Sequence, residues 1–296
     1  VSKSALYGNK GNDSFVLDGA ATSASTYGGA GNDSMLFGDA ANTLTYEGGI
    51  GNDSLTVVGA VNSSTIYGDS SSATEGGNDS LDIAGTASGS YIYGNYGDDS
   101  ISIDAGVVAS SVYGGAGTDS VWIANGASTA ALIDGGVGND FLSLGGLSGT
   151  SSVMGGAGAD SITVSGNATN ASQWLVDGGD DADSIYVTRA SERSSILGGS
   201  GADSIVFGSQ ISGGGGTTLD APGVAFGITS GSSMNISFTD AQASANFGTG
   251  ISNLFTVNNT LVSVGIDSSN YITLAFVGGG TVELQGFGEA EAQDIT

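Results

Sequence analysis

The sequence predicts an all-β protein whose chain is wound into a parallel β-solenoid. A glycine-rich loop ending in an aspartate recurs ten times, each loop is followed by a short alternating apolar run, and glycine makes up 54 of the 296 residues. Self-similarity at a fixed period of about 20 residues is typical of stacked repeat proteins. One repeat is therefore expected to form one coil of the solenoid.

The loop aspartates define the period. They are separated by 20, 20, 26, 20, 20, 21, 20, 23 and 20 residues. The two longest spacings contain acidic insertions, at residues 69–75 and 180–181. We interpret these as solvated bulges, with supplementary cation sites as the alternative. The aspartates are Asp13, Asp33, Asp53, Asp79, Asp99, Asp119, Asp140, Asp160, Asp183 and Asp203.

Two strands per coil are expected, one on each side of the loop. Apolar residues occupy the second and fourth positions after every loop aspartate, as Met35 and Phe37 do, with mostly polar residues between them. This period of two indicates a strand with one buried face. A further inward column precedes the loops, with Ile66 as a typical member and Thr26 and Tyr46 as weaker ones. Mostly small residues two positions earlier predict a thin interior.

The period is lost towards the end of the chain. Alternation nevertheless persists in four runs, at residues 234–238, 261–264, 271–274 and 281–284. A solenoid with an open apolar end would aggregate, so we interpret this part as a β-rich cap with a secretion or assembly role. The predicted domains are ten coils over residues 1–220 and a capping domain over residues 221–296.

Composition limits the function. The net charge is −26, with four basic residues, which disfavours nucleic acid and anionic membranes as partners and favours a cation. No apolar run approaches the roughly 18 residues of a membrane span. The chain has no His and no Cys, which excludes zinc-protease and thiol chemistry, and it has no Gly-x-Ser-x-Gly nucleophile motif. We therefore expect that the protein is not an enzyme.

The loop chemistry predicts calcium as the cofactor. Calcium takes six to eight oxygen ligands from carboxylates and backbone carbonyls. A Gly-Gly-x-Gly-Asn-Asp loop offers both, because glycine adopts positive φ without penalty and lets carbonyls converge. One aspartate per loop is too few, but stacked coils bring consecutive loops to a shared ion. All ten loop aspartates are therefore candidate ligands of multiple calcium ions; metal-free turns are the alternative.

One loop carries a family resemblance. The stretch Gly28-Gly29-Ala30-Gly31-Asn32-Asp33-Ser34-Met35-Leu36 resembles the nonapeptide of the RTX, or hemolysin-type, calcium-binding repeat family. The resemblance implies a right-handed parallel β-roll, calcium held between loops by the aspartate and loop carbonyls, and export of the unfolded chain by a type I system. Residues 281–287, followed by an acidic end, are similar to the termini of type I secreted proteins.

Some loops depart from the family pattern. Lys10 enters the first loop, Asn95 and Tyr96 alter another, and Asp181 replaces a glycine, so these are expected to be the weakest sites. The usual family coil has about 18 residues, two nonapeptides, with calcium loops on both edges. Here one edge carries the acidic loop and the coil is longer, which predicts two chemically unequal edges.

The leading interpretation is a calcium-stabilised extracellular structural protein, at the bacterial cell surface, that self-assembles into a surface layer or matrix filament. The uniform repeats and the acidic, Cys-free composition resemble surface-layer proteins. The alternatives are an adhesin or ice-binding module, or the calcium-folded C-terminal part of a larger type I secreted protein. Expected partners are further copies of the chain and a cell-surface polysaccharide.

Tyrosines directly precede several loops. Because each lies next to an inward residue, we expect their rings to point outward and to stack from coil to coil, with a sugar or partner site as the alternative. The tyrosines are Tyr7, Tyr27, Tyr67, Tyr93 and Tyr113.

Overall fold

The computed structural model describes residues 4–71, 76–124, 128–165, 174–187 and 195–207, and five C-terminal strands within residues 225–285. These parts consist of strands and the turns between them, and none of them forms a helix that could cross a membrane. The chain divides into two compact units, Val1–Gly145 and Gly146–Thr296. Each unit is a parallel β-solenoid, which confirms the predicted fold class.

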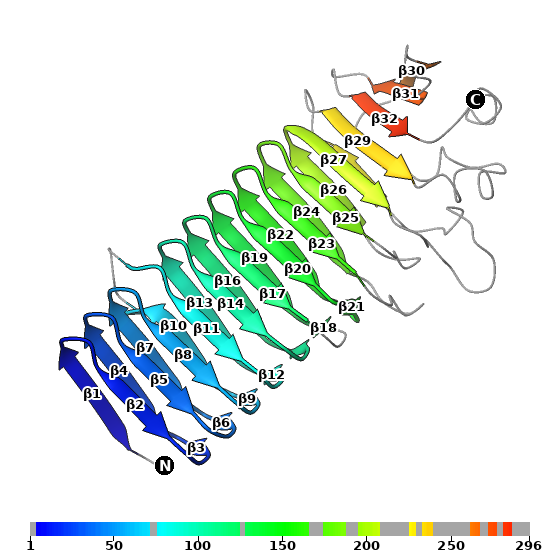
Figure 1. The fold of residues 1–296 in the computed structure, drawn as a ribbon. Coiled ribbons are helices and arrows are strands. Elements are labelled where there is room, and N and C mark those ends of the chain that lie inside the picture. Colours follow the sequence, from blue (N-terminus) through cyan, green and yellow to red (C-terminus); the bar gives the residue numbers. More distant parts are fainter. Residues whose placement is uncertain are drawn as a thin grey trace. The chain divides into compact units, whose positions relative to one another are not determined.

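Unit 1 is a stack of coils of about 20 residues that follow one another in chain order (Figure 1). Strands that run into the acidic loops form the entry sheet, made of β1 (Ala5–Lys10), β4 (Ser25–Ala30), β7 (Thr45–Ile50), β10 (Thr65–Asp69), β13 (Tyr91–Tyr96), β16 (Ser111–Ala116) and β19 (Leu132–Val137). Strands that leave the loops form the exit sheet, made of β2 (Ser14–Leu17), β5 (Ser34–Phe37), β8 (Ser54–Val57), β11 (Ser80–Ile83), β14 (Ser100–Ile103), β17 (Ser120–Ile123) and β20 (Phe141–Leu144).

The core of unit 1 lies between the entry and exit sheets. Alternate residues of both sheets face inward, as predicted, and Ile66, Leu81 and Ile103 have no exposed surface. Thr26 and Tyr46 are also buried in the entry-sheet column. Parallel register pairs like with like from coil to coil, for example Leu81 with Ile101 and with Leu55. A coil cannot bury its apolar face without its neighbours.

Six coils of unit 1 contain a third strand that the sequence analysis missed. These two-residue strands form the back sheet at the turn opposite the acidic loops: β3 (Ala21–Thr22), β6 (Ala41–Asn42), β9 (Val61–Asn62), β12 (Ala87–Ser88), β15 (Val107–Val108) and β18 (Ser128–Thr129). Strands of this length are too short to produce a periodic pattern. One small apolar residue per coil, such as Ala41 or Val61, fills the interior there.

The back turn also contains a ladder of buried serines. The Oγ of Ser90 accepts the backbone N–H of Ser64 at 3.1 Å, and the Oγ of Ser110 accepts that of Ser90 at 2.9 Å. Each of these hydroxyls also donates to a carbonyl of its own coil, Ser88 for Ser90 at 3.0 Å and Val108 for Ser110 at 2.9 Å. The small residues predicted for a thin interior therefore bond one coil to the next.

Unit 2 repeats the same arrangement. Its entry strands are β22 (Ser152–Ala157), β24 (Leu175–Asp180), β26 (Ser195–Ser200) and β28 (Ala225–Ile228), and its exit strands are β23 (Ser161–Val164), β25 (Ser184–Val187), β27 (Ala202–Phe207) and β29 (Ser233–Phe238), with β21 (Leu147–Ser148) at the back turn. Parallel pairing extends to β32 (Thr281–Gln285), which joins β29. Antiparallel strands β31 (Ile272–Phe276) and β30 (Leu261–Ile266) follow. The four C-terminal runs predicted to be strands are strands, and parallel stacking continues beyond residue 220.

Candidate metal centre

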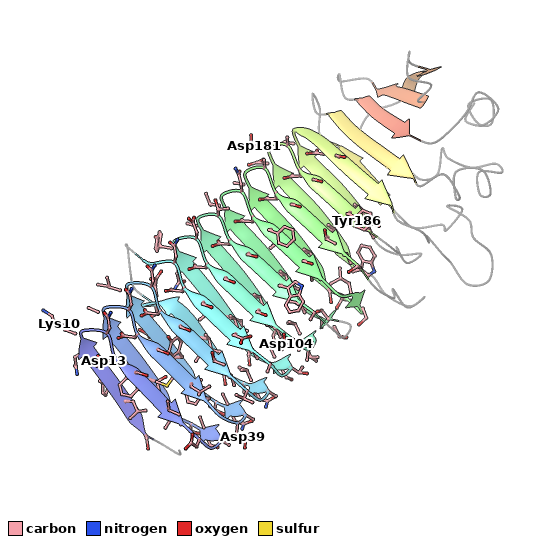
Figure 2. All side chains as sticks on the ribbon, in the orientation of Figure 1. Lys10, Asp13, Asp39, Asp104, Asp181 and Tyr186 are labelled. Atoms are coloured by element: carbon pink, nitrogen blue, oxygen red, sulfur yellow. The ribbon has the colours of Figure 1, made fainter. Side chains whose placement is uncertain are left out.

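The loop aspartates lie inside the coils. Each ends the loop between an entry strand and an exit strand, as Asp33 does between β4 and β5. Asp13 in the first coil is half-buried, whereas the other nine are at most 4% exposed. Figure 2 shows Asp13 at the loop edge of unit 1, on the same edge as Lys10. Carboxylates at this depth need partners, because an unpaired buried charge is strongly destabilising.

One oxygen of each carboxylate bonds to the preceding coil. The Oδ1 of Asp33 accepts the backbone N–H of Asp13 at 2.7 Å, and the Oδ1 of Asp53 accepts that of Asp33 at 2.7 Å. This pattern, which we call the aspartate ladder, continues in unit 1 through Asp79, Asp99, Asp119 and Asp140 and recurs in unit 2 from Asp160 to Asp183 and Asp203.

The second carboxylate oxygen, Oδ2, lacks a hydrogen-bond donor in most of these residues. In eight of the ten residues the buried Oδ2 makes no hydrogen bond: Asp13, Asp33, Asp53, Asp79, Asp99, Asp119, Asp183 and Asp203. Leaving a buried acceptor unsatisfied costs about 1–3 kcal/mol, and more for a charged group. A repeated, inward-facing orphan oxygen is therefore a candidate ligand atom.

This oxygen and a backbone carbonyl of the next coil both lie close to the first loop glycine. A Cβ placed on Gly28 would collide with the Oδ2 of Asp33 and with the carbonyl oxygen of Gly48 in the next coil. The same pair, a coil's own Oδ2 and the next coil's carbonyl, surrounds Gly8, Gly48, Gly68, Gly94 and Gly114 in unit 1 and Gly155 and Gly178 in unit 2. Both atoms are oxygens, the ligands that calcium takes. Carboxylate and carbonyl oxygens are the ligands that a calcium ion shared between coils would use.

The loop backbone requires glycine. Gly29 and Gly31 have φ values of 113° and 128°, in a region that side chains rarely adopt. Where the sequence departs from glycine, Asn9 (77°), Asn95 (83°) and Asp181 (72°) take its place, and Asn and Asp tolerate positive φ best among other residues. The three atypical loops therefore retain positive φ at the substituted positions.

Burial changes the acidity of the ladder. It raises the pKa of Asp53, Asp119 and Asp183 to about 7 and that of Asp79 and Asp99 to about 8. Neighbouring carboxylates raise these pKa values further, whereas the accepted N–H bonds lower them. In the folded chain, a loop aspartate is therefore more stable when it is protonated or bound to a cation than when it carries an unpaired negative charge.

A second ladder runs beside the first in the opposite sense. The Oδ1 of Asn12 accepts the N–H of Asn32 at 3.0 Å, and the Oδ1 of Asn32 accepts that of Asn52 at 3.1 Å. Here the side chain bonds to the following coil, whereas the aspartate bonds to the preceding one. This asparagine ladder explains the Asn-Asp pair of the loops, and sequence reasoning assigned no role to its first member.

The first insertion contains a buried structural carboxylate. Asp69 occupies the position of Gly49 in the register and has no exposed surface. Its Oδ1 accepts the N–H of Gly77 at 3.0 Å, and its Oδ2 accepts that of Tyr96 at 2.9 Å. Both oxygens are satisfied by backbone donors, so Asp69 connects the interrupted loop to the next coil. Residues 72–75 lie outside the described residues.

Two further carboxylates accompany the loops. Asp134 and Asp177 directly precede loop glycines on the outer face of the entry strands. Burial raises the pKa of both, and a backbone N–H two residues on lowers it. Asp134 in turn raises the pKa of Asp140, and Asp177 raises that of Asp183. The Asp-Gly-Gly sequence was a signal that could have identified them.

Tyr46 places a hydroxyl inside unit 1. The residue is 2% exposed, and its Oη makes no hydrogen bond. Burial, and then the charges of Asp53, Asp79 and Asp33, raise its pKa. The buried Oγ1 of Thr26, its neighbour in register, also lacks a partner. This coil pair is therefore more polar inside than the sequence pattern of the column suggests.

The predicted ligands are stacked from coil to coil in each unit and do not form a cluster of carboxylates. Across the described ranges, no group of three or more Asp, Glu, His or Cys side chains could hold an ion. A site here needs backbone carbonyls in addition to carboxylates. Compared with known proteins, the chain matches no family model and no curated protein. The class is given by the structure itself: a parallel β-solenoid with stacked ladders of buried aspartates.

Proposed function

We propose that the protein is a calcium-stabilised extracellular structural protein of the RTX type that self-assembles into a surface layer or matrix filament. The observation that supports the calcium part is an orphan buried Oδ2 and a carbonyl oxygen of the next coil that recur beside the first loop glycine of successive coils. Each ion would be held by loop oxygens of two coils and would neutralise the carboxylate between them.

The charge of the ladder supports a bound cation. Coils are stacked about 4.8 Å apart, and two carboxylates at that distance repel by about 3 kcal/mol at an effective dielectric constant near 20. Repeated along unit 1, this repulsion exceeds the roughly 5–15 kcal/mol that stabilises a typical domain. Once these carboxylates are ionised, the folded stack needs cations between its coils, and millimolar extracellular calcium is sufficient for modest sites.

The proposal of self-assembly rests on apolar side chains exposed on the outer faces of the sheets. Large apolar side chains are exposed there, including Trp122 (45%) and Phe141 (46%) on strands β17 and β20. The two residues lie on neighbouring strands, with Phe141 opposite Ser120 and Trp122 opposite Ser143. Adjacent exposed aromatic residues are typical of contact surfaces.

Calcium titration tests the first part. The chain is stripped of metal over a chelating resin, and calcium or magnesium is added at pH 7.5 while circular dichroism and binding heat are recorded. We expect calcium to induce the β spectrum with several ions bound, and magnesium to act weakly, because it demands a small octahedral site. Asp99→Asn is expected to lower the number of ions bound. A metal-free chain that is fully folded at this pH would refute the proposal.

Assembly is tested separately. Sedimentation and electron microscopy of the calcium-loaded chain are expected to show ordered polymers, and Trp122→Ser with Phe141→Ser to reduce them. Particles that stay monomeric at every protein concentration would contradict assembly and leave the calcium proposal standing.

A further inference from the structure

Two stacks of tyrosine rings lie on the outer face of the entry sheet in unit 1. Tyr7 and Tyr27 have ring centroids 5.0 Å apart and planes within 6° of parallel. Tyr93 stacks on Tyr67 at 4.9 Å and 11°, and on Tyr113 at 4.9 Å and 4°. The parallel strand register produces this arrangement, because it sets these residues directly beside one another.

The ring orientation determines what the stacks can do. The rings face one another along the stack with centroids 4.9–5.0 Å apart, which leaves no room for a sugar ring between them. Equivalent atoms of neighbouring rings are instead aligned at the coil spacing, including the hydroxyl and the ring carbons next to it. Glu47 interrupts the column in the third coil, so Tyr27 and Tyr67 belong to separate stacks.

We propose that these stacks are sites of oxidative modification, in which neighbouring rings couple to form dityrosine bonds between adjacent coils. The eligible pairs are Tyr7 with Tyr27, and Tyr93 with either Tyr67 or Tyr113. Tyr7 is 61% exposed, and the other rings are partly exposed, so a small oxidant reaches them.

The chemistry balances with a one-electron oxidant. Each of the two phenols loses one electron and one proton and becomes a phenoxyl radical. The radicals join through the ring carbons ortho to the oxygen, and the hydrogen on each of these carbons moves to its oxygen to restore both aromatic rings. One hydrogen peroxide molecule, used by a peroxidase, accepts the two electrons and two protons and is reduced to two waters.

Such a bond would give this chain a covalent link between coils. The sequence contains no Cys, so disulfides are ruled out. A bond between Tyr67 and Tyr93 would close a 26-residue segment, and a bond between Tyr7 and Tyr27 a 20-residue segment. Closing a segment restricts the unfolded chain and favours the folded one.

The test uses the full chain with calcium, under conditions in which circular dichroism shows the β fold. A photoactivated ruthenium complex with persulfate serves as the one-electron oxidant. We expect blue dityrosine fluorescence, the loss of two hydrogen atoms per bond, and cross-linked peptides that join the stacked pairs after proteolysis. The cross-linked chain is expected to unfold at a lower calcium concentration than the untreated one.

Two variants test whether the stacked rings are the ones that couple. Tyr93→Phe removes the shared partner of Tyr67 and Tyr113, so the second stack should yield no cross-link while Tyr7 and Tyr27 still couple. Tyr91→Phe is the matched control, because Tyr91 lies on the same strand, 6.4 Å from Tyr93 and outside the coil-to-coil stack, and it should leave all products unchanged. Folded chain that forms no dityrosine, or only bonds between unstacked tyrosines or separate molecules, would overturn the proposal.

Discussion

We expect the metal-free chain to be folded at acidic pH and to unfold as the pH rises through neutrality. Burial raises the pKa of Asp53, Asp79, Asp99 and Asp119 in unit 1 to about 7 or 8, whereas a carboxyl of the unfolded chain titrates near 3.9. A group whose pKa is higher in the folded state favours folding fully below the unfolded pKa. Its contribution is lost as the pH rises through 7 to 8.

The size of the effect can be worked out from these values. A pKa difference of three to four pH units corresponds to about 4–5 kcal/mol, and we halve it because solvent screens part of the charge. Four carboxyls then contribute roughly 8 kcal/mol in unit 1, which is comparable with the whole stability of a typical domain. Between pH 5 and pH 8.5 the metal-free chain should change from folded to unfolded.

The assay is urea unfolding of resin-stripped protein, followed by circular dichroism at a series of pH values. Adding calcium at pH 8.5 should restore the fold, because the ion replaces the protons. Asp104→Asn is the control, since Asp104 is exposed on the opposite edge (Figure 2), and it should leave the pH midpoint in place. Equal stability at both pH values, or greater stability at pH 8.5 without metal, would refute the reasoning.

Four substitutions and one control test other contacts by urea unfolding. Gly28→Ala forces a Cβ against a carboxylate and a carbonyl and should destabilise by about 2–4 kcal/mol, whereas Gly19→Ala, with open space around it, should change little. Ala109→Gly relieves a φ of 45° and should stabilise by about 1 kcal/mol; a loss of stability would contradict the strain. Ser90→Ala leaves a buried N–H without its acceptor and should cost about 1–3 kcal/mol. Tyr46→Phe removes an unsatisfied hydroxyl and should stabilise the metal-free chain by about 1–2 kcal/mol; a loss of stability would contradict this.

Much of the fold followed from the sequence because the determining residues repeat. The columns that contain Leu55 and Ile66 recur at a fixed spacing, and a period of two identifies their strands. Tyr93 lies next to an inward residue, so its outward orientation followed as well. The aspartates could be assigned to one edge for the same reason, since each closes an equivalent loop.

The parts that escaped prediction depend on contacts between coils. Asn12 and Ser64 are ordinary polar residues in the sequence, and their roles appear only when the next coil is placed beside them. Ala109 has positive φ at the back turn, although alanine does not favour that conformation. Asp69 resembles an acid in a surface insertion, yet it is buried, and backbone N–H groups of its own loop and of the following coil donate to it.

The opposite senses of the two ladders have a consequence for how the chain reaches its folded state. The N–H of a loop aspartate such as Asp33 is bonded by the coil that follows, and the N–H of a loop asparagine such as Asn32 by the coil that precedes. A coil that has left the ribosome before its successor therefore lacks the bond to its aspartate N–H. We expect such a chain to fold cooperatively over several neighbouring coils, with the bonding of its leading coils completed when later ones arrive.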